Sequence, residues 1–582
     1  MKRKRVKTKK KRDKVFYVKG FVIFMFLLVF SNQLRVQVFN RQAIIDKARH
    51  VHRLTATQII ESTRGQILSS DGKILACATE DYVFGVNPKT CPFSPALFSE
   101  ISGITGISAS ELLDIVSRGK DGIEWDLKIT REKVKAIKNI KTKYFADGIW
   151  VRPAGEREYP LGKHASGLIG FMKDGEGKAG IEKTYNELLR GKKGKKEGMT
   201  DKHGAILPWF IVNEEQQSED GQDIVLTIDA DIQRVASTSL NTYCLENKAS
   251  HGVAVVMNPK NGDILALANY PAFDPTKPER ELADAVVGKR STPELNPAVG
   301  LRFEPGSTFK VFTVALGLET GVINANSSVA CNGQKQFSVA NIRCSGDAGI
   351  KSHGSVAPRK CIEVSCNIAA ATWAVNIGFE KYSKFIERLE LLEPSGIGIH
   401  PEVPGQLNYN DWNKTIQMAN IGFGQSINAT PLNLTAAYSV FANEGRLVRP
   451  RLVKKIGENE IPVKPQKQII QPETAHTVMK MMEYVIESDS GTGRTLRVPG
   501  YRLAGKTGTA QKRDEKTGSM RSGRYVSSFI GYTPAENPKV VIFVMIDNPT
   551  AGKYYGAVVA GPVFREISEY LLRRWQVPPS RN

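Results

Sequence analysis

The amino-acid sequence predicts an α+β fold in which helices pack on an antiparallel sheet, preceded by a separate domain and by one N-terminal transmembrane helix. Three observations support this prediction. A basic tail precedes a long apolar run near the N-terminus, a hairpin pattern follows residue 250, and two apolar strand patterns lie close together near the C-terminus with helical patterns before them.

The N-terminal segment is strongly basic and leads directly into an apolar run. The chain of 582 residues carries 81 Lys and Arg against 59 Asp and Glu, which gives a net charge of +22. Residues 1–14 hold ten of the basic side chains and one acidic one, and Val15–Phe30 is apolar apart from Lys19. This order is typical of a positive-inside membrane segment, and it argues against nucleic acid as a partner of the tail.

The apolar run could instead belong to a cleaved signal peptide, because it is shorter than the roughly 20 residues that a spanning helix needs. The residues after Phe30 contain no small-x-small cleavage site. We therefore expect residues 1–14 to form a cytoplasmic tail and residues 15–34 to form a single-pass anchor in the inner (cytoplasmic) membrane. The remainder of the chain should lie outside the cytoplasm.

The part that follows the anchor is too long for one compact core, so it should contain at least two folded regions. Residues 35–220 mix short strand patterns with polar helical ones and show no catalytic constellation. An Asp-Gly pair directly before the apolar segment Ile224–Ile228 marks a boundary. We expect a first domain at 35–220, a second at 221–575 and a short tail at 576–582.

The second region carries the signals for the sheet and for the helices on it. Asp231–Leu240 has helical spacing, and Val253–Met257 and Ile264–Ala268 flank a Pro-Lys-Asn-Gly turn, which is typical of a β-hairpin. Tyr525–Tyr532 and Val540–Ile546 are two further strand candidates. The helical runs between the hairpin and these strands are Phe309–Leu318 and Ile368–Val375.

The seven cysteines form no CxxC pair, and the eight histidines include no HExxH pattern, so the sequence predicts no metal site. Cys331 and Cys344 flank a short polar segment and could form a disulfide in an oxidising compartment. All seven thiols could equally be reduced and buried. The sequence leaves this choice open.

The sharpest local feature is the segment Glu304–Lys310, EPGSTFK, where a Pro-Gly pair ends an irregular stretch and a helical pattern begins. Ser307 should lie at the helix start, where unpaired backbone N–H groups favour an alkoxide or an oxyanion. Lys310 lies on the same helix face, and if burial keeps it neutral it can accept the Ser307 proton. A lone Ser-x-x-Lys is a weak signal, because about two should occur by chance in a chain of this composition. The alternative is a capped helix with a solvated lysine.

A second segment, Ser365-Cys-Asn367, lies among helical patterns. Ser365 could relay a proton to a leaving amine, and Asn367 could hydrogen-bond a substrate amide. Taken alone, this segment is more simply interpreted as a helix cap or a turn.

The third segment, Lys506–Thr509, opens the C-terminal strand region with the sequence KTGT. Lys506 offers a positive charge, and the hydroxyls of Thr507 and Thr509 could bind a substrate carboxylate. Gly508 has no Cβ that would keep a peptide from docking against the strand edge. A lone Lys-Thr-Gly would more often be a turn.

In this order, the three segments are recognised as the signature of penicillin-binding proteins and class A β-lactamases. The chain resembles class B penicillin-binding proteins, monofunctional peptidoglycan D,D-transpeptidases in which an elongated pedestal domain of the dimerisation type precedes the transpeptidase domain. The forms of the third segment and of 157-REYPLG-162 are similar to those of the division-specific, septal branch. The other segments that carry the resemblance are 64-RG-65, 180-GIE-182, 221-GQDIVLTIDADIQ-233, 258-NPKNGDILALANYPAFDP-275, 422-GFGQSINATPLNL-434 and 554-YYGAVVAGPVF-564.

The resemblance implies a serine acyl-enzyme with Ser307 as the nucleophile and Lys310 as its base, without a metal or an organic cofactor. The backbone N–H groups of Ser307 and Thr509 would be the oxyanion donors. The implied catalytic residues are Ser307, Lys310, Ser365, Asn367 and Lys506, and the implied substrate-binding residues are Thr507, Gly508 and Thr509.

The resemblance also implies the partners of the protein. These are peptidoglycan stem peptides with a D-Ala-D-Ala donor, β-lactams, the cytoplasmic membrane, a polytopic glycan polymerase and other division proteins, with no nucleic acid. Three alternatives stay open: an elongation-specific transpeptidase, a D,D-carboxypeptidase or β-lactamase-like hydrolase that passes the acyl group to water, and a non-catalytic β-lactam sensor.

Overall fold

The computed structural model divides the chain into two packed units. The first contains residues 1–62, 80–154 and 192–219, and the second contains residues 63–79, 155–191 and 220–582. The described residues are 10–35, 55–60, 62–78, 81–119, 122–153, 157–200, 206–211, 217–277, 295–324, 326–346, 349–409, 413–513 and 520–580.

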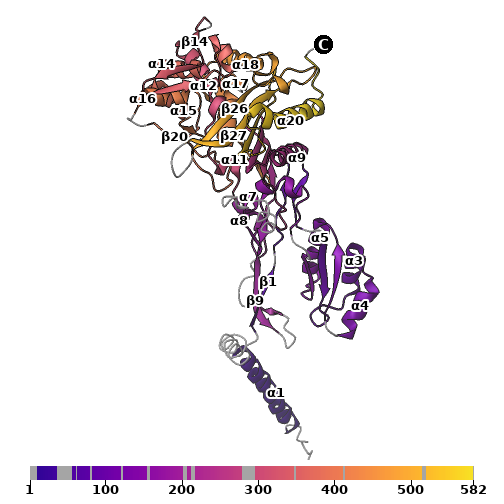
Figure 1. Ribbon diagram of the computed structural model, residues 1–582. Coiled ribbons are helices and arrows are strands. Elements are labelled where there is room, and N and C mark those ends of the chain that lie inside the picture. Colours follow the sequence, from indigo (N-terminus) through magenta and orange to yellow (C-terminus); the bar gives the residue numbers. More distant parts are fainter. Residues whose placement is uncertain are drawn as a thin grey trace, which may run out of the picture. The chain divides into compact units, whose positions relative to one another are not determined.

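The N-terminal apolar run forms a helix in the first unit. Helix α1 (Lys10–Leu34) contains the segment Phe16–Leu34, which is long and apolar enough to cross a membrane (Figure 1). Among the described residues it is the one helix with this character. The helix predicted for the anchor is confirmed, and its membrane topology stays a prediction.

The rest of the first unit contains two small antiparallel sheets. One has the strand order β1 (Thr55–Ile60), β9 (Gly194–Thr200), β10 (Ile206–Ile211). The other has the order β5 (Ile123–Lys128), β4 (Asp81–Val86), β6 (Ile149–Pro153), and its apolar face shares a core with three helices through side chains such as Phe84 and Phe98. The three helices are α3 (Pro95–Thr105), α4 (Ala109–Arg118) and α5 (Arg131–Lys143).

A five-stranded antiparallel sheet organises the second unit and confirms the predicted fold class. Its order is β13 (Ile264–Tyr270), β12 (His251–Met257), β28 (Val540–Asp547), β27 (Met520–Thr533), β26 (Ala504–Arg513). The predicted hairpin is β12–β13, and the two predicted C-terminal strands are β27 and β28. Strand β26, which carries the Lys-Thr-Gly-Thr segment, forms one edge of the sheet.

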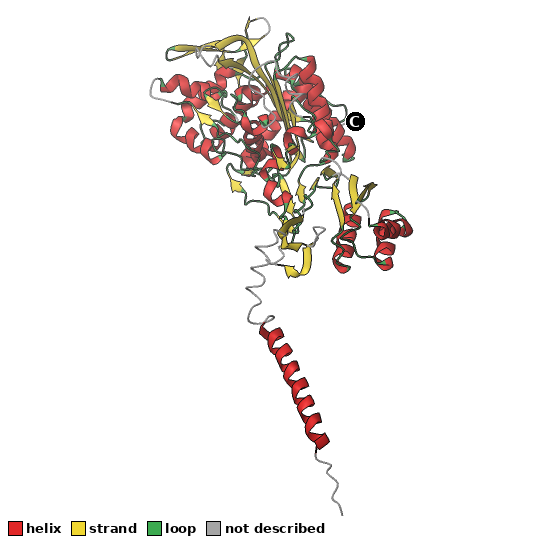
Figure 2. Cartoon of the chain, turned by 90° about the horizontal axis from the view of Figure 1, so that it is seen from below, coloured by secondary structure: helices red, strands yellow, loops and turns green. Residues whose placement is uncertain are grey.

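Helices cover both faces of this sheet, because its strands are apolar on both sides (Figure 2). All of β28 is buried, and its side chains alternate between two cores: Phe543 belongs to one and Val544 to the other. Helices α9 (Ala230–Glu246) and α20 (Gly561–Arg574) pack on the second core. The helices of the first core include α12 (Lys310–Glu319), α14 (Asn367–Ile377), α16 (Lys414–Gly422), α17 (Pro431–Ala442) and α18 (Pro472–Glu487). Helices α9, α12 and α14 confirm the three predicted helical runs.

Shorter elements complete the second unit. A mixed sheet has the order β24 (Asn459–Glu460), β23 (Val453–Ile456), β11 (Ile224–Leu226), β2 (Ile67–Leu68), β3 (Ile74–Ala76). The remaining elements are η2 (Gly162–His164), α6 (Ser166–Ile169), β7 (Met172–Lys173), β8 (Glu176–Gly177), α7 (Gly180–Thr184), α8 (Asn186–Arg190), α11 (Pro297–Gly300), η3 (Gly306–Phe309), β14 (Val329–Cys331), β15 (Gln334–Phe337), β16 (Ala340–Arg343), β17 (Ser345–Gly346), β18 (Gly349–Ile350), β19 (Gly354–Val356), α13 (Pro358–Glu363), α15 (Phe379–Arg388), β20 (Gln406–Leu407), β21 (Ile427–Asn428), β22 (Arg446–Leu447), β25 (Lys467–Gln468), η4 (Arg494–Leu496) and α19 (Gly556–Val559).

Three segments that the sequence placed before residue 220 meet at one buried ion cluster of the second unit. Glu182 is fully buried, and its carboxylate accepts from Arg64 Nη2 at 2.6 Å and from Arg157 Nε. The two guanidinium groups share this one buried carboxylate, so the pairing of the charges in this network depends on all three side chains. The cluster therefore holds residues 63–79 and 155–191 together, and the pairing of β2 with β11 joins the first of these ranges to the rest of the second unit.

Candidate active site

The predicted nucleophile lies in a single 3₁₀ turn, η3, that leads directly into α12. Ser307 is partly exposed, whereas Thr308 and Phe309 beside it are buried. Gly306 has a positive φ of 55°, a conformation that glycine adopts without strain, and its N–H donates to Gly424 O at 2.9 Å. The turn thus holds the Ser307 hydroxyl at the surface of a packed core, at the helix start that the sequence predicted.

Lys310 connects the first segment with the second. Its Nζ lies 2.8 Å from Ser307 Oγ, one turn earlier. It also lies 2.8 Å from the carbonyl oxygen of Ser365, 3.0 Å from Ser365 Oγ and 2.6 Å from Asn367 Oδ1. Segments that are 55 residues or more apart in the chain therefore converge on one amine.

The second segment joins α13 to α14 and confirms the interpretation of a helix cap. Cys366 is the N-cap of α14, and Ser365 before it has a positive φ of 60°. Asn367 Nδ2 donates to Arg343 O at 2.8 Å, which turns the Asn367 carbonyl oxygen toward Lys310. The cap therefore presents the Ser365 hydroxyl and the Asn367 amide to the base.

The third segment is an edge strand and not a turn. Thr507 and Thr509 alternate along β26 with Lys506 and Gly508. Lys506 is buried, and its Nζ lies 3.3 Å from Thr507 O. Thr509 is partly exposed, and its Oγ1 accepts from the N–H of Gly556 at 3.1 Å.

Gly508 allows the edge strand to approach the nucleophile turn. A Cβ at this position would lie 2.3 Å from Ser528 Oγ and 2.9 Å from Thr308 Cγ2. Both distances are shorter than normal contacts, so the structure gives this glycine a packing reason that differs from the docking reason inferred from the sequence. The absence of a side chain at 508 brings the first and third segments together.

Burial sets the electrostatics of the two lysines. Burial lowers the pKa of Lys310, and it lowers the pKa of Lys506 well below that of a lysine in water. The positive charge of Lys310 further lowers the pKa of Lys506. Two ammonium groups are therefore not favoured together, and the positive charge that the sequence argument assigned to Lys506 is opposed by its surroundings.

Two supporting residues received no role from the sequence. Gly424 accepts the hydrogen bond that fixes Gly306, and a Cβ at Gly424 would lie 2.1 Å from Gly306 O. Its place in the segment 422-GFGQSINATPLNL-434 was the signal that could have found it. Thr492 Oγ1 lies 3.1 Å from Thr507 Oγ1, and no sequence pattern pointed to it.

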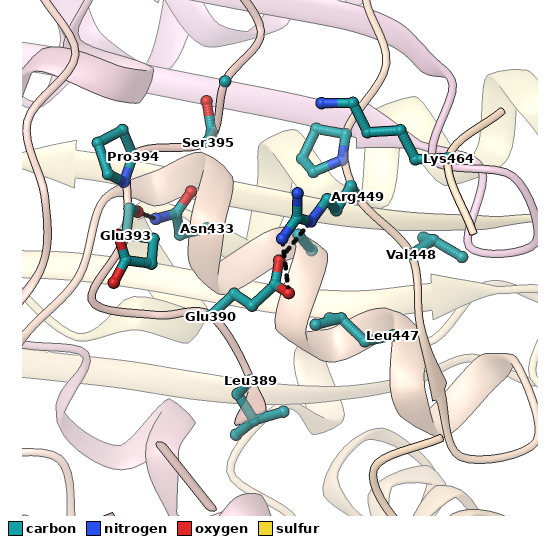
Figure 3. A pocket seen from close by; sticks show the side chains of 13 residues that line it. Leu389, Glu390, Glu393, Pro394, Ser395, Asn433, Leu447, Val448, Arg449 and Lys464 are labelled. Atoms are coloured by element: carbon teal, nitrogen blue, oxygen red, sulfur yellow. Dashed lines mark hydrogen bonds and ion pairs between the residues drawn. The ribbon is translucent and has the colours of Figure 1, made fainter. Parts of the chain in front are cut away.

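A separate cavity of about 350 Å³ lies elsewhere in the second unit (Figure 3). Arg449 and Glu390 meet in its wall, with Nε and Nη2 at 2.6 and 2.9 Å from the two carboxylate oxygens. Its lining includes Glu393 and Asn433 but no residue of the three segments. Arg449 and Glu390 pair with each other, and the cavity is not part of the candidate site.

The cysteines settle the choice that the sequence left open. All seven are free and buried. The Sγ atoms of Cys331 and Cys344 lie 3.8 Å apart and form no disulfide.

Two family descriptions match the chain. Residues 252–569 match the penicillin binding protein transpeptidase domain, and residues 59–226 match the penicillin-binding protein dimerisation domain. The transpeptidase match covers more than half of the chain and contains all three segments. The chain therefore belongs to the penicillin-binding proteins, and its combination of domains is that of class B.

Individual relatives agree with this assignment. The chain is 30% identical over 585 residues to stage V sporulation protein D of Bacillus subtilis, covering 98% of this chain and 87% of the relative. It is 28% identical to peptidoglycan D,D-transpeptidase FtsI of Buchnera aphidicola, covering 99% and 97%. The crystal structure of penicillin binding protein 3 of Mycobacterium tuberculosis, complexed with aztreonam, has a TM-score of 0.67 at 25% identity and covers 90% of this chain and 98% of that one.

Proposed function

We propose that this serine-type D,D-transpeptidase cross-links peptidoglycan stem peptides through an acyl-enzyme on Ser307, outside the cytoplasmic membrane and at the division septum. The observation that carries the assignment of the nucleophile is the set of four oxygens around Lys310 Nζ, one of which is Ser307 Oγ at 2.8 Å. The alternatives of a hydrolase and of a non-catalytic sensor are outcomes of the test below.

The contacts of Lys310 support a neutral amine that acts as a base. A neutral amine has two N–H donors and one lone pair. The Ser365 carbonyl and Asn367 Oδ1 can only accept hydrogen bonds, so they take the two donors. The lone pair is then left for the hydroxyl of Ser307, and the lowered pKa of Lys310 favours this state.

In the acylation step, Ser307 Oγ attacks the carbonyl carbon of the penultimate D-Ala, and its proton passes to Lys310. The peptide C–N bond breaks, and the amine of the terminal D-Ala leaves with a proton delivered through Ser365, whose Oγ lies 3.0 Å from Lys310 Nζ. The backbone N–H groups of Ser307 and Thr509 stabilise the oxyanion. An acceptor amine then attacks the ester, loses a proton along the same path and releases Ser307.

The edge strand β26 supports the binding of the donor peptide. An extended peptide can add to a free sheet edge through backbone hydrogen bonds. The hydroxyls of Thr507 and Thr509 can then bind the terminal carboxylate. A carboxylate beside Lys506 also opposes the effect of burial on its pKa, so substrate binding favours the positive charge that burial disfavours.

One experiment separates the possible reactions. The purified protein is incubated with a pentapeptide donor and an amine acceptor, and the products are identified by mass spectrometry. A cross-linked product supports the proposal, a product shortened by one D-Ala without cross-links supports the hydrolase, and no turnover supports the sensor. The matched control is Ser307→Ala, which should neither turn over the donor nor gain the mass of a labelled penicillin. A label on another residue would contradict the assignment of Ser307.

The septal role is supported by the form of 157-REYPLG-162 and by the similarity to the FtsI relative. A transpeptidase requires glycan strands made at the same place, so we propose that the residues before 220 bind a polytopic glycan polymerase. Helix α1 would hold the N-terminus in the cytoplasm, because the basic tail precedes the apolar segment.

A fluorescent fusion and controlled depletion test this role in cells. We expect septal fluorescence, and filaments or chains on depletion. Lateral fluorescence with round cells would favour the elongation branch instead. A defect confined to spore formation would favour a sporulation role, the second candidate, which rests on the 30% identity to stage V sporulation protein D.

A further inference from the structure

Three cysteines and one histidine lie close together beside the second segment, Ser365-Cys-Asn367. Cys331 ends β14, Cys344 follows β16, His353 precedes β19 and Cys366 caps α14. One ligand atom from each residue lies within 4.8 Å of those from the other three. Four metal-binding side chains from four separate segments therefore face one point.

Three of the six distances between these ligand atoms match those of a tetrahedral metal centre, and all six are within 4.8 Å. Zinc bonds of about 2.3 Å to sulfur and 2.0–2.1 Å to nitrogen, at tetrahedral angles, place two sulfurs about 3.8 Å apart and a sulfur and a nitrogen about 3.6 Å apart. The Sγ atoms of Cys331 and Cys344 lie 3.8 Å apart, and those of Cys344 and Cys366 lie 3.7 Å apart. Cys331 Sγ and His353 Nδ1 lie 3.5 Å apart.

The surroundings suit thiolate ligands. The exposed fractions of the Cys331, Cys344 and Cys366 residues are 0%, 2% and 0%. The N–H of Asn367 donates to Cys344 Sγ at 3.3 Å, and the N–H of Ala369 donates to Cys366 Sγ at 3.5 Å. Such outer hydrogen bonds orient metal ligands and stabilise the charge on sulfur. A single disulfide would use two of the thiols and would not explain why the third cysteine and the histidine lie at the same point.

We infer that Cys331, Cys344, His353 and Cys366 bind one zinc ion in a closed tetrahedral site. Soft thiolates and imidazole select zinc over magnesium or calcium, and binding releases the thiol protons to solvent. Because the protein supplies all four ligands, no position stays open for a substrate, and the ion is structural. No pattern in the sequence indicated this site, because the ligands are separated by 12, 8 and 12 residues and form no CxxC pair.

The site would act as a clamp on the catalytic motif. Cys366 stands between Ser365 and Asn367, and Cys344 follows Arg343, whose carbonyl oxygen accepts from Asn367 Nδ2 at 2.8 Å. A metal that joins Cys344 to Cys366 therefore holds both the cap and the strand that fix the Asn367 amide toward Lys310. The four cysteine and histidine side chains are positioning residues in this scheme.

The test begins with metal content. The full chain is purified in detergent without chelators, and zinc is measured by mass spectrometry per mole of protein. We expect one zinc per chain, and after exchange with Co²⁺ we expect the thiolate charge-transfer and tetrahedral d–d absorption of a cobalt–sulfur site. His353→Ala and Cys331→Ser should each lose the metal and the cobalt spectrum. The matched control is Cys244→Ser, a fully buried thiol on α9 in the other core, which should retain both.

Two results would overturn the site: zinc-free protein that gives no cobalt spectrum, or peptide mapping that finds a Cys331–Cys344 disulfide in the native protein. The clamp is tested separately by acylation with a labelled penicillin. Removal of zinc should slow acylation by about tenfold or more, and its return should restore the rate in the parent protein but not in His353→Ala. An unchanged rate in zinc-free protein would refute the clamp. The zinc content does not depend on the proposed roles of Ser365 and Asn367. A failure of the zinc site can therefore be distinguished from a failure of those catalytic roles.

Discussion

Substitution of Asn367 by aspartate tests the role of Lys310 directly. The side chain keeps its size, but a carboxylate oxygen replaces the amide oxygen that lies 2.6 Å from Lys310 Nζ. A negative charge at this place favours the protonated form of the amine and raises its pKa. A base that must be neutral to work then becomes available only at higher pH than in the parent protein.

The size of the shift in the pKa of Lys310 follows from the distance between its Nζ and the side-chain oxygen of residue 367. At 2.6 Å and an effective dielectric constant of about 20, two unit charges attract by ~6 kcal/mol. Desolvation of the carboxylate and loss of the bond from Asn367 Nδ2 to Arg343 O cancel part of this attraction. If about half remains, Lys310 holds its proton about 100-fold more tightly. The ascending limb of the pH–rate profile should therefore move by about two pH units to higher pH, and along this limb the acylation rate should rise about tenfold per pH unit.

The assay is stopped-flow acylation by a fluorescent penicillin across neutral and alkaline pH. Asn367→Ala is the informative comparison, because it removes the acceptor without adding a charge and should slow acylation without moving the ascending limb to higher pH. Asn413→Asp, at the N-cap of α16, should behave like the parent protein. If the ascending limb of Asn367→Asp coincides with that of the parent, Lys310 is not the base and the mechanism above is wrong.

Three further substitutions test other parts of the structure. Lys310→Arg should abolish penicillin acylation because arginine stays protonated, whereas Lys506→Arg keeps the charge and should retain part of the acylation. Complete loss of acylation in both variants would remove the distinction between the two lysines. Gly508→Ala should lower stability by about 1–3 kcal/mol in a thermal melt, since the new Cβ would lie 2.3 Å from Ser528 Oγ, and an unchanged melting temperature would contradict the packing argument. Glu182→Gln should cost about 3–5 kcal/mol in urea unfolding, because it leaves the buried Arg157 and the partly buried Arg64 without their carboxylate. A cost below about 1 kcal/mol would show that the ion cluster is not needed.

The structure also changes the interpretation of the Ser-x-Asn and Lys-Thr-Gly-Thr segments. The Ser-x-Asn segment is both a helix cap and a part of the site, since Cys366 caps α14 while Ser365 and Asn367 face Lys310. The Lys-Thr-Gly-Thr segment is an edge strand whose glycine permits close packing against the nucleophile turn. For the Ser-x-Asn segment the simpler local interpretation and the functional one describe the same backbone, whereas the turn considered for the Lys-Thr-Gly-Thr segment is replaced by a strand.

The sequence by itself determined the elements whose signals are local. The helix at Ser307 begins at a Pro-Gly pair, the hairpin β12–β13 surrounds a turn with Asn-Gly, and the apolar strands β27 and β28 differ from the segments around them in composition. The order of the three motifs was enough to indicate the family. These features depend on neighbours a few residues away, so the linear chain displays them.

Only the tertiary structure decided the features that depend on distant residues. Three of the four oxygens around Lys310 Nζ come from a segment at least 55 residues later, and strand β12 pairs with β28, which follows it by more than 280 residues. The ion cluster of Glu182 joins distant segments in the same way, since Arg64 lies 118 residues before Glu182. The Cys331 cluster is assembled in the same way from four segments whose spacing in the sequence follows no metal-binding pattern. Hydrogen bonds, ion pairs and ligand geometry act across a few ångströms of space, and folding alone brings these side chains within that range.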